Sequence, residues 1–504
     1  MRFLLPLLLV FSALLCLLPG CEPKEDLLTT DGSAKLEFSA DTVLFDTVFA
    51  QVGTVSKRLW VYNRNARAVR VEQIRLADTN PGTYSLLING DETTAASNFE
   101  IRGKDSLLIL VKAVLGPSAA VNKPFLVDDQ LLFRTNGNEQ EVKLVAYGQN
   151  AYFHGIEEHI TRNTTWLKNR PHVIYGLVVV DPGVTLLIQP GTRIYSHAGS
   201  GMLVQGTLRI NENTNPTAEL APNDTATFVR FQGDRLESFY AETPGQWRGI
   251  QFDASSRNNV VRFTEIKNAS FGLLILNPLN ATPHPKVTAE NTILRNISGA
   301  ALSFASLGAD FDGGGVISFS GDFDLRNCLF TNCGEYAMLG YGGTYDVNFC
   351  TFANYTPQFQ RKSASLSFTN EAADSRAVQP NTTRITINNS IVWGSIADEL
   401  FFKNGDQYRP TLNIRNSILR TAEYRATTDA GSKLGFDNNS NQLNVNPKFR
   451  SSPENSGDRY DYRLDTLSPA SNKGIYNSLV PRDLLNKARN TSTPDLGAYE
   501  RVNP

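Results

Sequence analysis

The residues best suited to chemistry in this 504-residue chain lie in glycine-rich segments. Residues 308–315 read Gly-Ala-Asp-Phe-Asp-Gly-Gly-Gly, which places Asp310 and Asp312 two positions apart. On a strand such side chains point to the same side, and two carboxylates on one side could bind Ca²⁺ or approach a sugar. A solvated turn is the alternative. Three nearby tyrosines could stack on sugar rings or simply pack their loop: Tyr336, Tyr341 and Tyr345.

A second candidate is a row of cations on repeated segments of the chain. Lys267, Arg295 and Arg326 each lie in one copy of the repeat described below. If the copies stack in register, these side chains would form a stripe that attracts an anionic glycan. Ordinary outward charges that alternate with Glu265 and Glu290 are the alternative.

Other common catalytic arrangements are missing from the sequence. The 5 histidines are scattered without metal-ligand spacing, and no Gly-x-Ser-x-Gly motif, P-loop or dinucleotide fingerprint occurs. The 48 Lys and Arg against 50 Asp and Glu give a net charge of −2, which argues against nucleic acid as the main partner. We expect no cofactor other than a possible Ca²⁺ at the paired aspartates.

The cysteines exclude a disulfide framework. Cys16 lies in the N-terminal apolar segment, and Cys21 directly follows it. The remaining three are an odd number, so at most one bridge can form within the chain. Either Cys328 or Cys333 could pair with Cys350.

The N-terminus has the layout of a secretory signal, with Arg2 before an apolar run. Residues 1–20 end in Leu-Pro-Gly before Cys21, and this resembles a bacterial lipoprotein signal. The resemblance implies that Cys21 becomes the mature N-terminus and carries acyl chains that anchor it to a membrane. An uncleaved anchor helix, or ordinary cleavage with a free Cys21, is the alternative.

Residues 21–34 are expected to be a polar tether. Their Lys24-Glu25-Asp26 triplet resembles the short acidic export signal of surface-exposed lipoproteins in some Gram-negative bacteria. This implies the outer face of the outer membrane, with the periplasmic leaflet as the alternative.

Residues 35–149 are rich in β-branched and aromatic residues and are divided by turn signals such as Asn89-Gly90-Asp91. Apolar and polar residues alternate, for example through Leu59 and Val61, as in an antiparallel sandwich. The segment resembles the cysteine-free immunoglobulin-like modules of abnormal-spindle and hydin proteins. The resemblance rests on three segments: residues 45–48, 59–63 and 132–136.

Residues 150–450 contain an internal repeat. Its consensus is apolar, polar, usually Asn, small, usually apolar, apolar, variable and usually Asn. A segment this short cannot bury its own apolar face, but copies stacked about 4.8 Å apart build one continuous core. The small residue would face inward, and Asn suits a left-handed corner. The pattern predicts a right-handed parallel β-helix rather than antiparallel strands. Six copies carry it: residues 261–268, 289–296, 325–332, 347–354, 387–394 and 414–421.

Residues 451–504 are expected to close this β-helix. Ordered motifs resemble the end of bacterial pectate-lyase-like β-helix proteins termed choice-of-anchor Q, for which activity is generally not established. The motifs are residues 446–449, 461–464, 468–474 and 495–500.

Together these patterns predict an all-β protein, an immunoglobulin-like sandwich followed by a parallel β-helix, held on a membrane by Cys21. The long repetitive surface and the missing catalytic constellation favour glycan or protein binding without catalysis. The alternative is a polysaccharide lyase or glycoside hydrolase, because β-helices also carry such enzymes.

Overall fold

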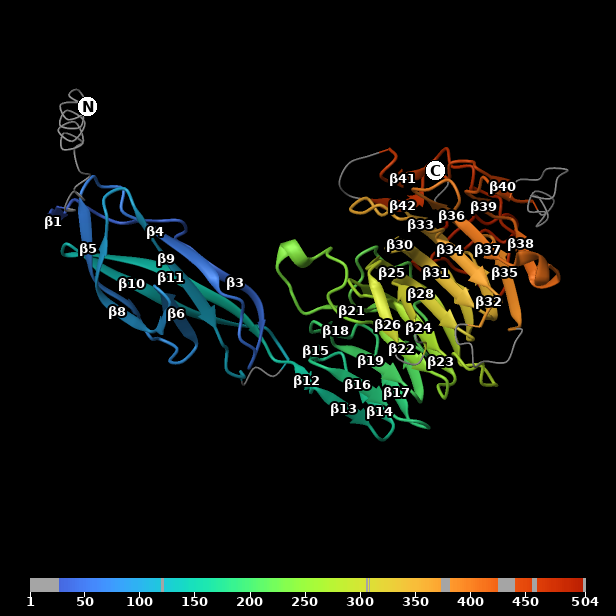
Figure 1. Cartoon of the computed structure of the whole chain (residues 1–504), viewed down its shortest axis with the longest axis horizontal. Helices are drawn as coiled ribbons and strands as arrows, with labels where there is room; N and C mark the ends of the chain where they lie inside the picture. The colour runs from blue at the N-terminus through green and yellow to red at the C-terminus, as the bar shows by residue number, and fades with distance from the viewer. Residues whose placement is uncertain are drawn as a thin grey trace, which may run out of the picture. The chain divides into compact units, whose positions relative to one another are not determined.

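The computed structural model of the chain describes residues 27–118, 122–304, 307, 309–372, 381–424, 440–455 and 460–501 (Figure 1). The expected signal, Cys21 and the acidic triplet lie outside these residues. The chain folds as two units, which divide after Asn150. No described residue belongs to a helix long and apolar enough to cross a membrane.

The first unit is an immunoglobulin-like sandwich, as predicted. One sheet contains β1 (Leu28–Thr29), β5 (Ala68–Leu76), β8 (Ala95–Ile101), β10 (Phe125–Thr135), β11 (Asn138–Gln149) and β3 (Thr42–Phe49). The facing sheet contains β2 (Glu37–Phe38), β4 (Lys57–Tyr62), β9 (Ser106–Ala113), β6 (Tyr84–Ile88) and β7 (Asp91–Thr93).

Alternation builds the core of this sandwich. Leu59 and Val61 of β4 are fully buried, while Trp60 between them is 37% exposed. The folded unit begins earlier than expected, because Leu28 pairs with Ala68 inside the segment predicted to be a tether.

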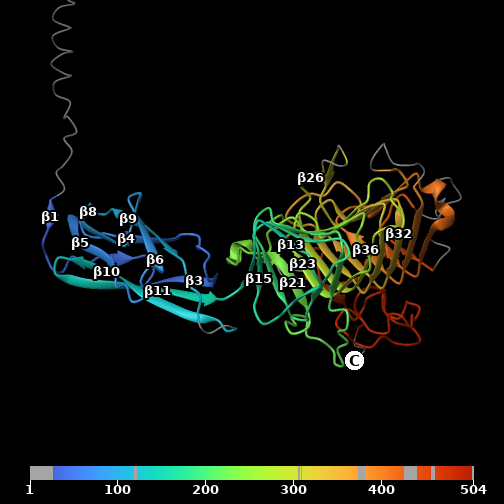
Figure 2. The same ribbon diagram turned by 90° about the horizontal axis from the view of Figure 1, so that it is seen from below.

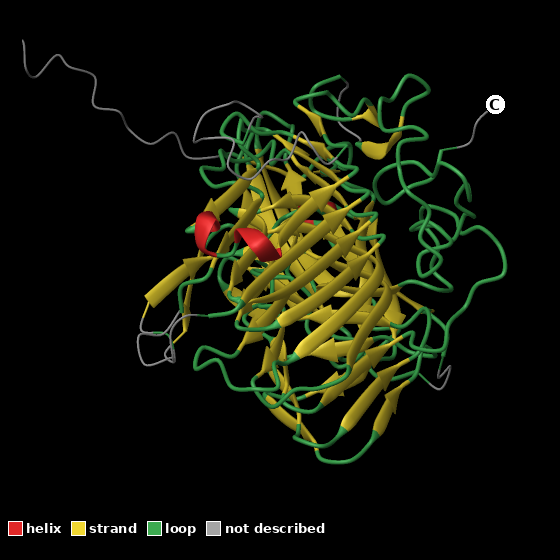
Figure 3. Ribbon diagram, turned by 90° about the vertical axis from the view of Figure 1, so that its right-hand side faces the viewer, coloured by secondary structure: helices red, strands yellow, loops and turns green. Residues whose placement is uncertain are grey.

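The second unit is a right-handed parallel β-helix, which confirms the predicted fold class. Its strands stack in two parallel ladders (Figure 3). The short ladder takes one strand per coil: β13 (Glu157–Ile160), β16 (Leu177–Val180), β19 (Gly201–Val204), β22 (Ile250–Asp253), β24 (Leu273–Leu276), β28 (Gly314–Phe319), β31 (Tyr336–Tyr341), β34 (Leu366–Thr369) and β37 (Leu400–Lys403).

The long ladder takes two strands from most coils, one on each side of a corner. Its first half is β12 (Tyr152–His154), β14 (Thr164–Trp166), β15 (His172–Ile174), β17 (Thr185–Ile188), β18 (Arg193–Ser196), β20 (Thr207–Ile210), β21 (Val229–Gly233), β23 (Asn259–Lys267) and β25 (Lys286–Ile297). Its second half is β29 (Asp322–Arg326), β30 (Leu329–Cys333), β32 (Gly343–Asn348), β33 (Thr351–Asn354), β35 (Thr383–Asn388), β36 (Ile391–Gly394), β38 (Leu412–Arg415), β39 (Ile418–Leu419) and β40 (Gln442–Leu443).

A few short elements lie outside these ladders. The remaining strands form two antiparallel pairs, β26 (Ala301–Phe304) with β27 (Ala309–Asp312), and β41 (Phe449–Ser451) with β42 (Asp461–Leu464). Short 3₁₀ helices are η1 (Ser238–Tyr240), η2 (Gly405–Gln407) and η3 (Arg409–Thr411).

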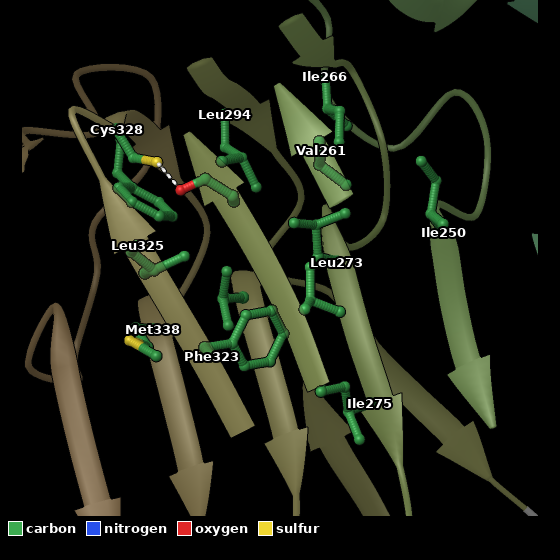
Figure 4. Close-up of a cluster of buried hydrophobic side chains, with 14 of the residues drawn as sticks. Ile250, Val261, Ile266, Leu273, Ile275, Leu294, Phe323, Leu325, Cys328 and Met338 are labelled. Carbon is green, nitrogen blue, oxygen red and sulfur yellow. Dashed lines mark hydrogen bonds between the residues drawn. The ribbon is translucent and has the colours of Figure 1, made fainter. Parts of the chain in front are cut away.

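The repeat explains the coil corner. Its small residue is fully buried in all six copies and links neighbouring coils; the backbone N–H of Cys350, for example, donates to Ser390 Oγ at 3.1 Å. The preceding residue has a left-handed φ between 42° and 52° in every copy, which favours Asn. Inside the corner, aliphatic and aromatic side chains stack into one core (Figure 4). The three cysteines are buried free thiols, so no bridge joins Cys350 to either partner.

Residues 460–501, here called the closing segment, run along the side of the coils (Figure 2). Leu484 and Ala498 pack on Leu329, on the outer face of the long ladder. The corner asparagines fix this position, because Asn291 Nδ2 donates to the Asp483 carbonyl at 2.7 Å. The segment therefore covers a flank of several coils.

Candidate functional site

The outward side chains of the long ladder form a groove floor just N-terminal to the area that the closing segment covers. Arg193 of β18 stands opposite Arg230 of β21, which in turn stands opposite Glu265 of β23. Two residues further on, Lys267 stands opposite Arg295 of β25. Outward positions on stacked parallel strands are about 4.8 Å apart, so this register concentrates four cations around one carboxylate.

Glu265 is the centre of this cluster. Its Oε2 accepts a hydrogen bond from Arg230 Nε at 2.8 Å, and its Oε1 accepts one from Arg295 Nε at 2.6 Å. Burial alone would raise the pKa of Glu265, but the charges of Arg295, Arg230 and Lys267 outweigh it and lower that pKa. Glu265 is therefore an ionised anchor for the two arginines and cannot donate a proton at neutral pH.

The cations around Glu265 exceed the charge that it can balance. Burial, and then repulsion from Arg295, lower the pKa of Lys267. Arg193 lies at the edge of the cluster and has no carboxylate within ion-pair distance among the described residues. This end of the groove favours an anionic ligand.

The groove has two joined parts. The first, here called the cationic hollow, has a volume of about 500 Å³ and is lined by Arg193, Tyr195, Arg230 and Lys267. The second, here called the tyrosine hollow, has a volume of about 720 Å³. Both are lined by Pro222, Glu265 and Arg295, so they form one continuous depression across several coils.

The closing segment supplies aromatic side chains to the tyrosine hollow. Tyr460, Tyr462 and Tyr499 line it, and Tyr460 is 40% exposed. The ring of Tyr462 stacks on that of Tyr355 with centroids 6.1 Å apart, which fixes its orientation. The exposed ring of Tyr460, whose centroid lies 6.3 Å from that of Tyr462, offers an apolar face and a polar hydroxyl group, a combination that suits the face of a sugar ring.

A second carboxylate of this hollow is also held ionised. Asp461 accepts hydrogen bonds from Arg463 Nε and Nη2 at 2.8 and 2.6 Å. Burial raises its pKa, but the bonds from Arg463 outweigh burial, and the pKa falls below the usual range. Neither Asp461 nor Glu265 can serve as the acid of a glycosidase, which must be protonated at the working pH.

The candidate residues from the glycine-rich segments lie elsewhere, on the outside of the short ladder. Asp310 and Asp312 are exposed on β27, and Asp310 accepts a hydrogen bond from Ser303 Oγ at 2.5 Å. Below this hairpin, the ring of Tyr341 meets that of Phe311 edge-on at 5.6 Å. The hairpin therefore brings the predicted aspartates and Tyr341 into one area of the surface.

Asp312 has an acidic neighbour that the sequence did not single out. Burial, and then the negative charge of Glu335, raise the pKa of Asp312. Tyr336 is half-buried beside this pair, and burial followed by Asp312 and Glu335 acts to raise its pKa. Among the described residues no group of three or more His, Cys, Asp or Glu could hold a metal ion.

Two expectations about further residues were wrong. Arg326 does not join Lys267 and Arg295, because it stands opposite Glu290 and pairs with Asp324 at 2.5 Å. Tyr345 is not available to a ligand, because it is fully buried.

Sequence reasoning missed most of the groove. Lys267 and Arg295 share the seventh position of the repeat, so their alignment could be predicted. Arg193 and Arg230 lie before the recognised copies, and Tyr460 lies on a segment that returns from far along the chain. The repeat gave no signal for these residues.

The comparisons with known proteins give no family. No protein-family model matches the chain, and no curated protein matches it. Among solved structures, a PapD-like domain of human CEP192 is 12% identical with a TM-score of 0.16; the match covers 24% of this chain and 89% of that domain. The Escherichia coli chaperone DraB is 13% identical with a TM-score of 0.16, over 22% of this chain and 54% of the chaperone.

Another solved structure matches over more of the chain. The catalytic unit of a GH87 alpha-1,3-glucanase from Streptomyces thermodiastaticus is 13% identical with a TM-score of 0.24, over 72% of this chain and 79% of that enzyme. Similarities this weak do not indicate a shared activity, so the function has to be inferred from the groove itself.

Proposed function

We propose that this protein binds an acidic polysaccharide in the groove and does not cleave it. The observation that carries the proposal is the charge of the cationic hollow, whose four cations outnumber the two carboxylates beside them, Glu265 and Glu242. The cations are Arg193, Arg230, Lys267 and Arg295. Carboxylate or sulfate groups of a glycan would neutralise the excess positive charge, and arginine binds such groups with two parallel hydrogen bonds.

The shape of the groove supports a chain-like ligand. The cationic and tyrosine hollows adjoin through Glu265 and Arg295 and run across stacked coils. A polymer could place an acidic sugar on the arginines and a following sugar against Tyr460.

Binding without cleavage is supported by the state of the carboxylates. Glu265 and Asp461 both have lowered pKa values and are held by arginines. The groove thus lacks, in these two residues, the protonated acid that hydrolysis requires.

The proposal includes the expected anchor. Cys21 would carry the lipid and hold the protein on the outer membrane, with its β-helix displayed outside the cell. Mass spectrometry of the N-terminal peptide from membranes would show acyl chains on Cys21, and Cys21→Ser would release the protein. An unmodified, uncleaved N-terminus would contradict the anchor without affecting the groove.

The experiment that tests the groove is a binding series with purified full-length protein in detergent. Uronate-containing, sulfated and neutral polysaccharides would be compared by calorimetry at low and high salt. We expect the acidic polymers to bind, with affinity that falls as salt rises, because screening weakens exposed charge pairs. Equal binding of neutral polymers, or no binding of acidic ones, would refute the proposal.

A second candidate function is glycoside hydrolysis at the hairpin. It is favoured by the position of Asp312 near Glu335, whose negative charge acts after burial to raise the pKa of Asp312, since glycoside hydrolases work with a pair of carboxyl groups. New reducing ends in the same polysaccharide series, lost in Asp312→Asn, would support it. New ultraviolet-absorbing unsaturated ends would instead indicate a lyase.

A further inference from the structure

Besides Glu265, a second carboxylate of the protein contacts the cationic cluster. Glu242 follows η1 in the loop of residues 234–246 and lines the tyrosine hollow. Its Oε2 is 2.5 Å from Arg295 Nη1, and its Oε1 is 3.7 Å from Lys267 Nζ. Asn296 Nδ2 also donates to this carboxylate. One loop carboxylate is therefore held by two cations and an amide.

Glu242 differs from Glu265, which also contacts Arg295. The side chain of Glu265 is 12% exposed and lies on a strand, whereas that of Glu242 is 52% exposed and lies on a loop. Arg295 donates a hydrogen bond from Nε to Glu265 and another from Nη1 to Glu242. Glu265 is thus part of the floor, and Glu242 is the partner that solvent, or a ligand, can reach and replace.

The same loop carries an exposed aromatic side chain. Phe239 in η1 is 78% exposed. Contacts from the groove floor hold the loop down, because Lys267 Nζ donates to the Ala241 carbonyl at 3.1 Å and Asn268 Nδ2 donates to the same carbonyl at 3.1 Å. Displacement of Glu242 would remove one of the contacts that keep Phe239 where it is.

We propose that Lys267, Arg295 and Asn296 form a carboxylate subsite which Glu242 occupies as an internal competitor, and which the carboxylate of a uronic-acid unit takes over on binding. This inference rests on the proposed function and deepens it, because it names the acidic group and the subsite that receives it. The contacts of Glu242 show that these three donors can bind a carboxylate group.

Because Glu242 competes for the subsite, the affinity of the wild-type protein for a uronate carboxylate is lower than it would be if the three donors were free. A tethered side chain acts at a high effective concentration, so a ligand must displace it. A half-exposed ion pair is worth about 0.2–1 kcal/mol, which converts to about a 1.4- to 5-fold change in affinity. Removal of the Glu242 carboxylate should therefore tighten the binding of a uronate polymer by about that factor.

The test compares Glu242→Gln with wild-type full-length protein, using polygalacturonate as the probe in calorimetry. Glu237→Gln is the matched control, because Glu237 lies on the same loop but pairs with Arg235 at 3.1 Å. Both variants remove one negative charge from the loop, and only the first removes a carboxylate from the subsite. We expect tighter binding in Glu242→Gln than in the control, even if its melting temperature falls.

Hydrogen exchange supplies a readout that does not depend on affinity. If the ligand displaces Glu242, exchange of the amides in residues 238–243 should rise when polygalacturonate is added to the wild type. Slower exchange there on binding would show that the ligand packs on the loop as it stands, and would overturn the inference.

The outcomes separate this inference from the proposed function. Equal or weaker binding by Glu242→Gln, with clear binding by the wild type, overturns the internal competitor and leaves acidic-glycan binding intact. Binding that appears only in Glu242→Gln supports the internal competitor but contradicts acidic-glycan binding by the wild-type protein. If none of the three proteins binds polygalacturonate or a sulfated polymer, the proposed function fails and the inference fails with it.

Discussion

The guanidinium carbon of Arg489 lies 3.9 Å from the centroid of the Phe349 ring. Phe349 takes the corner position that Asn fills in most copies of the repeat, and it does so at a φ of 52°, which is strained for a bulky residue. The same arginine donates to Asn327 Oδ1 at 2.7 Å, on the neighbouring coil. One buried cation of the closing segment therefore supports two successive corners.

Replacement of this cation should strongly destabilise the β-helix. Arg489→Leu leaves the carboxylate of Glu500 and the amide of Asn327 without their partner, and breaking a buried pair costs about 3–5 kcal/mol. Denaturant unfolding would measure the loss. The control is Arg482→Leu, because Arg482 is exposed and its loss should cost less than about 1 kcal/mol. Similar small effects of both changes would contradict the role given to Arg489.

Stability should fall in acid because of a buried histidine. Burial, followed by the charge of His154, lowers the pKa of His172 to about 3. Below pH 6.5 the unfolded chain therefore binds a proton at this position that the folded chain excludes. The free energy of unfolding should drop by about 1.4 kcal/mol for each pH unit from this group between about pH 6.5 and pH 3.

The variant His172→Phe should flatten this part of the pH profile, measured by denaturant unfolding between pH 7 and pH 5. His159→Gln should not, because His159 is exposed and the hydrogen bond that its ring donates to Asp181 raises its pKa. A profile of His172→Phe as steep as that of the wild type would show that other groups cause the acid sensitivity.

Loss of Arg193, which pairs with no carboxylate among the described residues, should weaken glycan binding without harming the fold. Arg193→Gln removes a charge of the cationic hollow and leaves no described carboxylate without a partner. At low salt we expect about two- to fivefold weaker binding of an acidic polymer, and a smaller difference at high salt. Calorimetry at two ionic strengths would measure both, with Arg482→Leu as the control for net charge.

The hairpin aspartates should be dispensable for the fold. Asp310 and Asp312 are exposed, so the double change Asp310→Ala with Asp312→Ala should cost less than about 1 kcal/mol. Binding in the groove should stay unchanged, because neither residue lines it. Weaker binding by this variant would place the ligand at the hairpin instead.

The repeat allowed the coil to be predicted because each feature follows from local geometry. A small residue at 350 or 390 is fully buried inside the coil, and Asn at 291 or 327 suits a left-handed corner. The seventh position of the repeat correctly paired Lys267 with Arg295. Arg326 holds the second position of its copy, before the corner, and this is why it lies with Glu290.

The groove could not be predicted in the same way because its parts lie far apart along the chain. Tyr460 and Glu242 reach the floor from a closing segment and a loop that have no periodic pattern. Side chains of this kind are brought together by packing between distant segments, and one sequence contains no signal of that packing. The aspartate pair stood out by composition, yet its acidic neighbour Glu335 arrives from the next coil.

The position of the closing segment bears on synthesis and quality control. Asn291 binds the carbonyl of Asp483, which leaves the ribosome 192 residues later. Until that segment is synthesised, apolar side chains on the outer face of the ladder, such as Leu329, are not covered by Leu484 and Ala498. A chain that stopped before residue 460 would keep its coils but would expose apolar side chains such as Leu329. Exposed apolar surface of this kind promotes aggregation. Residues 460–501 thus protect apolar side chains of coils that are synthesised well before them.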